Sequence, residues 1–260
     1  PYFAFEHQSY VESILALVGF PASVYAGYLL YSGRASLFTL TRAIAIMLFI
    51  YLPFETIPAF TVAGFSVPEP RRILIEIVAT QTGMLIDLLG YAPEAVTSSE
   101  GYDAAYSWTL DDGHTVIIHI VLACTGLGSM AIFGGLVAAV EAPLSRKFRA
   151  LAVSIPLIYV LNILRTTFIS VVAGNQYMHW YPDLVLTMFG ATDPYRVSFL
   201  ISDRIMSQLL AVVALIAITF LAVRELPELA VILEDVLYLI TGEEHDLTEA
   251  LDLPREPTNR

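Results

Sequence analysis

Apolar residues gather in five long blocks, which short polar or charged segments separate. A helix needs around 20 apolar residues to cross a hydrocarbon core about 30 Å thick. The pattern therefore predicts an all-α polytopic membrane protein with at least five transmembrane helices. Reading the blocks and their breaks gives these spans: Ile14–Tyr31, Ala43–Ala63, Thr125–Ala142, Leu151–Ala173 and Val197–Val223.

Basic residues fall at three places between or after these blocks, and the alternation of spans puts all three on one side. They are Arg34, Arg42, Arg146, Lys147, Arg149 and Arg224. Segments rich in Lys and Arg stay in the cytoplasm. We therefore expect residues 64–124, residues 174–196 and the N-terminus to face the outside.

The segment Arg71–Tyr91 is rich in Ile and Leu but does not fit the alternation. Less apolar positions recur at helical spacing down one side, namely Arg72, Glu76, Thr80, Gly83 and Asp87. A helix with such a stripe lies in a membrane interface more readily than it crosses the bilayer. We expect an outer interfacial helix. The alternative is a sixth span, which would leave Arg34 and Arg42 outside.

The residues before the third block favour a strand. Thr115–Cys124 contains a run of β-branched side chains, and Gly126 and Gly128 interrupt it before the helical pattern resumes. We expect a short extracellular strand that leads into the third span. One long helix from His114 is the alternative.

Composition supports the membrane prediction and excludes several classes of protein. Hydrophobic residues make up 57% of the 260-residue chain and charged residues 15%, against roughly 45–50% and about 25% in soluble domains. A formal charge of −12 excludes nucleic-acid binding through a basic surface. The single cysteine excludes an intramolecular disulfide and a multi-cysteine metal site.

Negative charge accumulates at the C-terminus. The segment 225–260 holds ten acidic residues against two arginines. We expect residues 1–224 to form a membrane-embedded domain, and residues 225–260 an acidic cytoplasmic tail with a short amphipathic helix. Because residue 1 is proline, we also expect the N-terminus to be incomplete.

Cys124 is the candidate nucleophile. At the start of a helix, unpaired amides and the positive dipole end would stabilise its thiolate. Arg165 and Arg204 lie within apolar blocks, about 20–25 Å across the membrane and about 10 Å below the outer surface at 1.5 Å per residue. The topology therefore brings three groups from three spans into the outer leaflet.

Two arginines beside one cysteine can stabilise a thiolate and bind the oxyanion of an acyl-transfer intermediate. A buried guanidinium costs at least about 2.5–3.5 kcal/mol unless it is paired or hydrated. The alternatives are a cysteine that only fills the core, and arginines that snorkel or form structural ion pairs. Asp203 or Asp193 would then be the partner of Arg204.

Two further polar residues are candidates for supporting roles. Asn162, one helical turn before Arg165, is expected to hold that arginine by hydrogen bonding, and Glu55 could bind substrate or cap a kink at the end of the second block. The histidines are expected on surfaces or at interfaces.

Three motifs carry a resemblance to a known family: Ala123-Cys-Thr-Gly-Leu-Gly-Ser129, Asn162-Ile-Leu-Arg165 and Ser202-Asp-Arg204. Over roughly Arg71–Val223, their order resembles the exosortase/archaeosortase family of membrane cysteine transpeptidases. Bacterial exosortases have a histidine at the third basic position. Arginine there resembles the archaeosortase A branch, and the acidic composition agrees with that branch's prevalence in halophilic archaea.

The resemblance implies an enzyme of the cell membrane whose active site faces outward. Such an enzyme cleaves a C-terminal sorting signal of exported surface proteins, of the Pro-Gly-Phe type for surface-layer glycoproteins, and transfers the new C-terminus to a membrane lipid through a thioester. It implies no cofactor and no metal. Cys124 would be the nucleophile, Arg165 would bind the substrate carbonyl or the oxyanion, and Arg204 would stabilise the thiolate.

Two functions of other classes compete with this interpretation. Intramembrane arginines also occur in anion transporters and channels. A non-catalytic membrane scaffold could use the acidic tail as its docking site. A reactive thiol would distinguish the enzyme from both.

Overall fold

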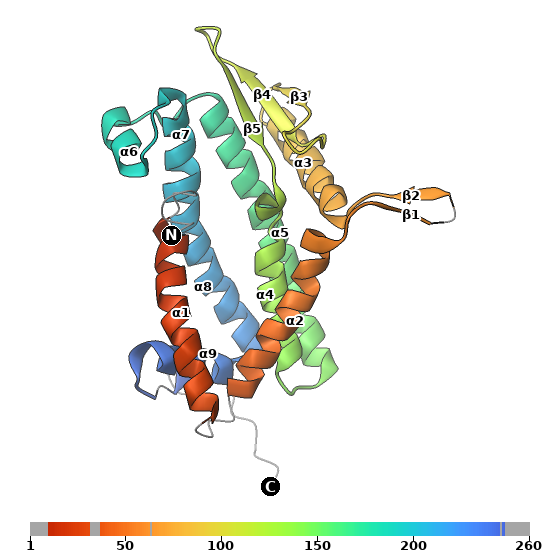
Figure 1. Cartoon of the computed structure of the whole chain (residues 1–260), viewed down its shortest axis with the longest axis vertical. Helices are drawn as coiled ribbons and strands as arrows, with labels where there is room; N and C mark the ends of the chain where they lie inside the picture. Colours follow the sequence, from red (N-terminus) through yellow and green to blue (C-terminus); the bar gives the residue numbers. More distant parts are fainter. Residues whose placement is uncertain (1–9, 32–36, 63, 245, 248–260) are drawn as a thin grey trace. The chain divides into compact units, whose positions relative to one another are not determined.

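The computed structural model describes residues 10–31, 37–62, 64–244 and 246–247 (Figure 1). Arg34, His7, His245 and residues 248–260 of the expected acidic tail lie outside these residues. The chain divides into two compact units. Unit 1 comprises residues 1–50, 129–156 and 216–260, and unit 2 comprises residues 51–128 and 157–215. The boundaries fall within helices, so four helices contribute residues to both units.

The described part of unit 1 consists of helices and the loops that connect them. It contains α1 (Tyr10–Tyr31), α9 (Leu229–Thr241) and segments of α2 (Leu37–Thr56), α4 (Leu127–Ala139), α5 (Leu144–Gly174) and α8 (Gln208–Glu225). A Cβ on Gly135 of α4 would lie 2.5 Å from the Ala43 carbonyl oxygen of α2, so glycine permits this close approach. Arg146 pairs with Glu228 at 3.1 Å, which links the start of α5 to the residues before α9.

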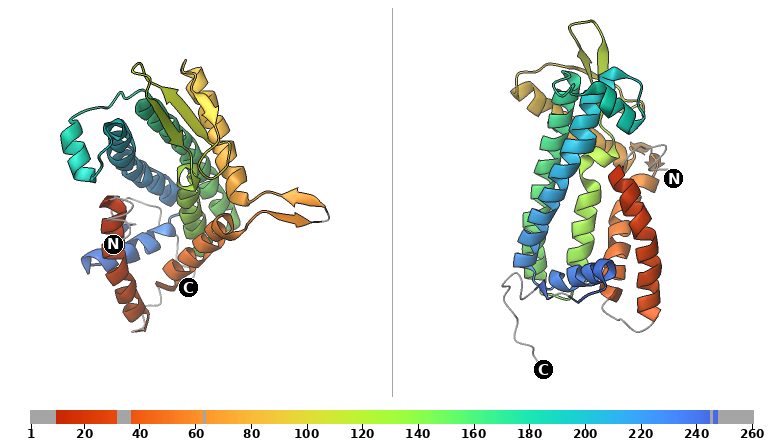
Figure 2. Two further views of the ribbon diagram at one scale, coloured as in Figure 1. Left: turned by 45° about the horizontal axis from the view of Figure 1, so that its top comes forward. Right: turned by 90° about the vertical axis from the view of Figure 1, so that its left-hand side faces the viewer.

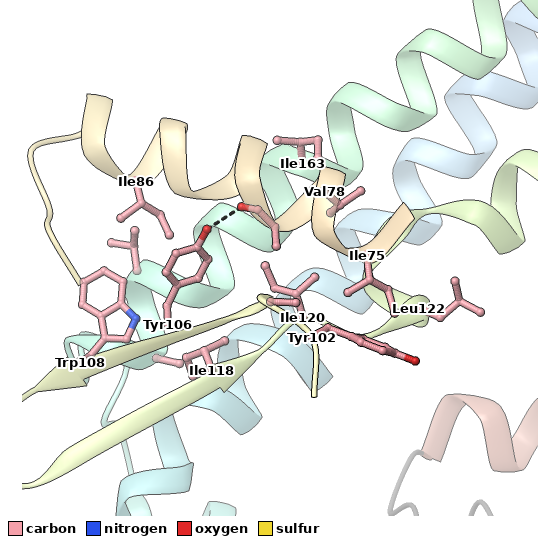
Figure 3. Packing of buried hydrophobic residues seen from close by; sticks show 14 of the residues in the cluster. Ile75, Val78, Ile86, Tyr102, Tyr106, Trp108, Ile118, Ile120, Leu122 and Ile163 are labelled. Carbon is pink, nitrogen blue, oxygen red and sulfur yellow. Dashed lines mark hydrogen bonds between the residues drawn. The ribbon is translucent and has the colours of Figure 1, made fainter. Parts of the chain in front are cut away.

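Unit 2 contains a three-stranded antiparallel sheet in the order β3 (Glu94–Val96), β4 (Ala105–Thr109) and β5 (Thr115–His119). Tyr106 pairs with Ile118, and Trp108 with Val116, so these side chains lie on one face. Figure 3 shows Tyr106, Trp108 and Ile118 facing α3 (Pro70–Leu88). The Tyr106 hydroxyl donates to the Ala79 carbonyl at 2.6 Å.

The helix α3 confirms the helical prediction for Arg71–Tyr91. Its apolar face packs on the sheet, with Ile75, Val78 and Ile86 completely buried. Its location at a membrane interface stays a prediction.

The strand predicted before the third span is confirmed. Strand β5 ends at His119 and is followed by the 3-10 turn η2 (Leu122–Thr125), after which α4 begins at Leu127. The alternative of one long helix from His114 is wrong, because β5 pairs with β4 along its length. The all-α prediction is likewise incomplete, since a mostly helical chain also carries two small sheets.

Three described helices are long and apolar enough to cross a membrane: Leu37–Thr56, Leu144–Gly174 and Pro194–Glu225. The first expected span is helical as α1, although several of its side chains lie outside the described residues. The third expected span corresponds to α4, whose 13 residues extend only about 20 Å. The count of five spans is therefore not confirmed.

The second expected span is too long in the prediction. Helix α2 ends at Thr56, two residues before Pro58, which has no N–H to continue a helix. Residues 60–62 form β1 instead, and β1 pairs with β2 (Phe65–Val67) in a separate hairpin. Apolar composition alone did not distinguish this hairpin from the end of a helix.

The last membrane helix is composite. After α6 (Pro182–Phe189) come η3 (Pro194–Arg196), α7 (Val197–Phe199), the π-helix η4 (Leu200–Ser207) and α8, which run on without a break. Figure 2 shows this helix from two further directions. Tyr195 of η3 donates to Asp112 at 2.6 Å and stacks on His114 at 3.6 Å between ring centroids. These contacts attach the start of the composite helix to the β4–β5 turn.

Candidate active site

Cys124 is the third residue of η2, the turn between the sheet and α4. Its side chain is partly buried and packs against the hydrophobic core of unit 2. The Cys124 amide donates to the Val121 carbonyl at 2.8 Å. Gly126 then adopts a left-handed conformation, with φ +76°, before α4 begins. The cysteine therefore precedes the helix and does not occupy its first turn, unlike our expectation.

Two side chains of α5 hold the main chain of Cys124. The Asn162 amide donates to the Cys124 carbonyl, and the Thr166 hydroxyl lies 3.2 Å from the same oxygen. A Cβ on Gly126 would lie 3.1 Å from the Asn162 Cβ. Asn162 thus fixes the cysteine turn, whereas the sequence had suggested that it held Arg165.

Arg165 of α5 and Arg204 of η4 meet at one carboxylate, that of Asp203. The Arg165 Nη2 atom lies 2.7 Å from Asp203 Oδ1, and Arg204 Nε lies 3.5 Å from Asp203 Oδ2. The Asp203 side chain is 15% exposed. A carboxylate shared by two guanidiniums offsets part of the cost of burying their charge.

Asp203 and Arg204 lie in the π-helix η4. Residues 200–207 have π-type hydrogen bonding, whereas α8 continues with ordinary α-helical bonding. π-helical turns are rare and occur often at functional sites. The π-turn therefore supports a functional site at the position that the third motif indicated.

Both arginines act electrostatically on the cysteine. The pKa of the Cys124 thiol is raised above its ordinary value, chiefly by burial. The positive charges of Arg165 and Arg204 lower it by less, and the Asp203 carboxylate raises it further. The two guanidiniums and the carboxylate together leave one net positive charge. A thiolate or an oxyanion at Cys124 would neutralise that charge.

Arg165 also has a hydrogen-bond donor that its described contacts do not use. Within the part of the chain that the structure describes, its buried Nε–H has no hydrogen-bond partner, although its Nη2 atom contacts Asp203. A buried donor without a partner carries a desolvation cost of about 1–3 kcal/mol. A bound acceptor, such as a carbonyl oxygen or an oxyanion, would remove that cost.

The other candidate residues lie elsewhere in unit 2. Glu55 accepts from Tyr51 at 3.0 Å and lies 3.9 Å from Arg71, so its described contacts belong to an ion cluster on α2 and α3. His119 Nδ1 lies 3.4 Å from the Ser99 amide, and His114 stacks on Tyr195. Asp193 caps η3 by accepting from the Tyr195 amide.

Sequence reasoning missed two contacts of this site. Asp203 was considered only as a partner of Arg204, and its bond to Arg165 depends on the packing of two helices. Thr166 was not singled out, although it follows Arg165 directly and lies one turn after Asn162. Its position on the Asn162 face was an available signal.

Known proteins are similar to this chain over most of its length. The family described as "Transmembrane exosortase (Exosortase_EpsH)" matches residues 2–194, which include Cys124 and Arg165. The archaeosortase A of Haloferax volcanii is 55% identical over 97% of this chain and 83% of its own length. The archaeosortase A of Natronomonas pharaonis is 42% identical over 92% of this chain and 74% of its own length.

No solved structure is significantly similar to this chain. The family match nevertheless covers well over half of the residues, and both relatives exceed 40% identity across most of the chain. The family match ends before Arg204, so the third basic position lies outside it. This chain belongs to the transmembrane exosortase family.

Proposed function

We propose that Cys124 is the nucleophile of this enzyme and that the positive charges of Arg165 and Arg204 stabilise the anions that form during the reaction. As a member of its family, the protein is a membrane cysteine transpeptidase that processes C-terminal signals of surface proteins. One observation supports the assignment of residues: two arginines from different helices share Asp203. The charges of both also lower the pKa of the Cys124 thiol.

In the first step, the Cys124 sulfur attacks a peptide carbonyl of the signal. A carbon–sulfur bond forms, the peptide carbon–nitrogen bond breaks, and the thiol proton ends on the departing amine. The tetrahedral intermediate carries negative charge on oxygen, and positioned donors at that oxygen lower the barrier. The product is a thioester together with the released C-terminal segment.

We assign Arg165 to the substrate oxygen and Arg204 to the thiolate. Arg165 has the unused Nε–H, and a planar guanidinium can bind Asp203 through one nitrogen while it donates to substrate through another. Arg204 takes the third basic position of the family. In the second step, a nucleophile from a membrane lipid attacks the thioester carbonyl. A bond from that nucleophile to the carbonyl carbon forms, the carbon–sulfur bond breaks, and the proton of the nucleophile returns to the Cys124 sulfur, which leaves the processed protein attached to the lipid.

The active site faces the outside of the cell membrane in this proposal. Arg204 precedes Arg224 by twenty residues of one continuous helix, or about 30 Å, which matches the thickness of a hydrocarbon core. Arg224 and the basic residues at the start of α5 fit the cytoplasmic side. The substrates are exported proteins whose C-terminus carries a Pro-Gly-Phe type motif, an apolar helix and basic residues.

The nucleophile is tested by replacing Cys124 with serine or alanine and comparing full-length and clipped substrate. Serine keeps the size of the side chain, but its hydroxyl does not ionise near neutral pH, so clipping should stop while the protein remains in the membrane. Arg196→Gln is the matched control, because Arg196 is exposed and lies just before the composite helix. Normal clipping by either Cys124 variant would overturn the proposal.

A further inference from the structure

The hairpin β1–β2 has one face made only of apolar side chains. Phe60 pairs with Val67, and Val62 pairs with Phe65, across the two strands. Residues opposite each other, and residues two apart on one strand, share a face. The apolar face is therefore formed by Phe60, Val62, Phe65 and Val67, and the other face carries Thr61 and Ser66.

This face is open to the surroundings. Phe65 is 78% exposed, Val62 56% and Phe60 46%. Figure 1 and Figure 2 show the hairpin standing clear of α3 and of the three-stranded sheet in the same unit. An isolated two-stranded hairpin is only marginally stable in water. A surface that takes up the apolar face would stabilise it.

The covalent neighbour of the hairpin is a membrane helix. Helix α2 ends at Thr56, four residues before Phe60, so the strand begins within about 14 Å of the helix end. The twelve residues 57–68 include no charged side chain. A charged protein surface would therefore find no complementary charge here, whereas a lipid surface needs none.

The helix that follows has a second exposed apolar stripe. Ile77, Met84 and Leu88 of α3 lie on one side at helical spacing and are 45%, 64% and 80% exposed. The face of α3 that packs on the sheet is a different one. Two consecutive elements after a membrane helix thus present apolar residues outward.

We propose that the apolar face of the β1–β2 hairpin inserts into the lipid interface at the Thr56 end of α2. Amphipathic helices at a membrane surface bury their apolar face about 5–10 Å deep in the boundary between headgroups and acyl chains, and we expect a similar depth for the hairpin. The hairpin then anchors the segment that joins α2 to α3. The proposal does not depend on the assignment of catalytic residues.

The test uses single-cysteine variants of the full chain. In a Cys124→Ala background, Phe65→Cys places a fluorescent label on the apolar face, and Ser66→Cys places it on the polar face one residue away. The protein is reconstituted into phosphatidylcholine vesicles that contain nitroxide-labelled lipid. The label at position 65 should be quenched several-fold more than the label at position 66, most strongly by a nitroxide near the headgroup end of the acyl chain.

Equal quenching at the two positions would overturn the proposal, and so would stronger iodide quenching at position 65. Energy transfer between labels on separate molecules, without quenching by lipid, would identify a second copy of the chain as the occupant instead. Val62→Cys repeats the measurement on the same face. It should behave like position 65, which guards against a local effect of one substitution.

Discussion

The Asp203 carboxylate neutralises one of the two positive charges in the candidate site. Its carboxylate touches both arginines, yet it leaves the three groups with one net positive charge. The charges of both arginines lower the pKa of the Cys124 thiol. Buried guanidiniums without a counter-ion are costly, whereas two such counter-ions would cancel the charge that a thiolate needs. A single shared carboxylate satisfies both requirements.

Asp203→Asn tests this balance. The carboxylate raises the pKa of the Cys124 thiol, so its removal should lower that pKa and speed alkylation at any pH below it. Clipping of substrate should nevertheless fall severely, because Arg165 loses its ionic anchor. The two opposite changes separate this role from simple unfolding. Slower alkylation together with unchanged clipping would contradict it.

The two arginines should respond differently to lysine. Lysine keeps the charge but lacks the planar fork, so Arg204→Lys should retain part of the clipping activity because a thiolate needs mainly a nearby cation. Arg165→Lys should lose nearly all activity, since an oxyanion site depends on donor geometry. The thiol pKa is measured from the pH dependence of alkylation. If Arg165→Lys raises that pKa and Arg204→Lys does not, the two roles are reversed.

At the scale of elements, the turn between β5 and α4 determines where the sulfur lies. Gly126 takes a left-handed conformation and passes close to Asn162, whose amide holds the Cys124 carbonyl. The left-handed conformation and the close contact with Asn162 thus explain why glycine follows Cys124 and Thr125. Cys124 is the third residue of the 3-10 turn η2, which ends at Thr125, and Gly126 allows the chain to turn into α4.

Gly126→Ala should destabilise the protein and reduce clipping. A non-glycine residue in this conformation costs about 1–3 kcal/mol, and the added Cβ would lie 3.1 Å from Asn162. Gly128→Ala is the matched control, because no atom lies within 4 Å of a Cβ placed there and alanine favours a helix. Thermal unfolding in detergent should show a lower midpoint for Gly126→Ala only. Equal midpoints would mean that the turn is not constrained.

At the scale of the whole molecule, the proposed orientation places the candidate site and the basic residues near the helix ends on opposite sides of the membrane. In a Cys124→Ala background, Asp111→Cys in the β4–β5 turn should react with a membrane-impermeant maleimide on intact cells. Ser145→Cys, beside Arg146, should react only after the cells are permeabilised. Both positions are exposed in the structure. Labelling in the reverse order would invert the topology and place the active site in the cytoplasm.

The sequence alone determined the properties that depend on composition and on order along the chain. Apolar blocks indicated membrane helices, β-branched residues indicated β5, and the spacing of Cys124, Arg165 and Arg204 indicated one site. The sequence placed the end of α2 too late, because an apolar hairpin and an apolar helix have the same hydropathy.

Only the tertiary structure decided which groups meet. The pairing of Asp203 with Arg165, and of Asn162 with the Cys124 carbonyl, joins residues 38 positions apart. Such contacts depend on how helices and turns pack, which local patterns do not encode. The apolar face of the β1–β2 hairpin likewise follows from its strand register, since a shift by one residue would exchange its two faces.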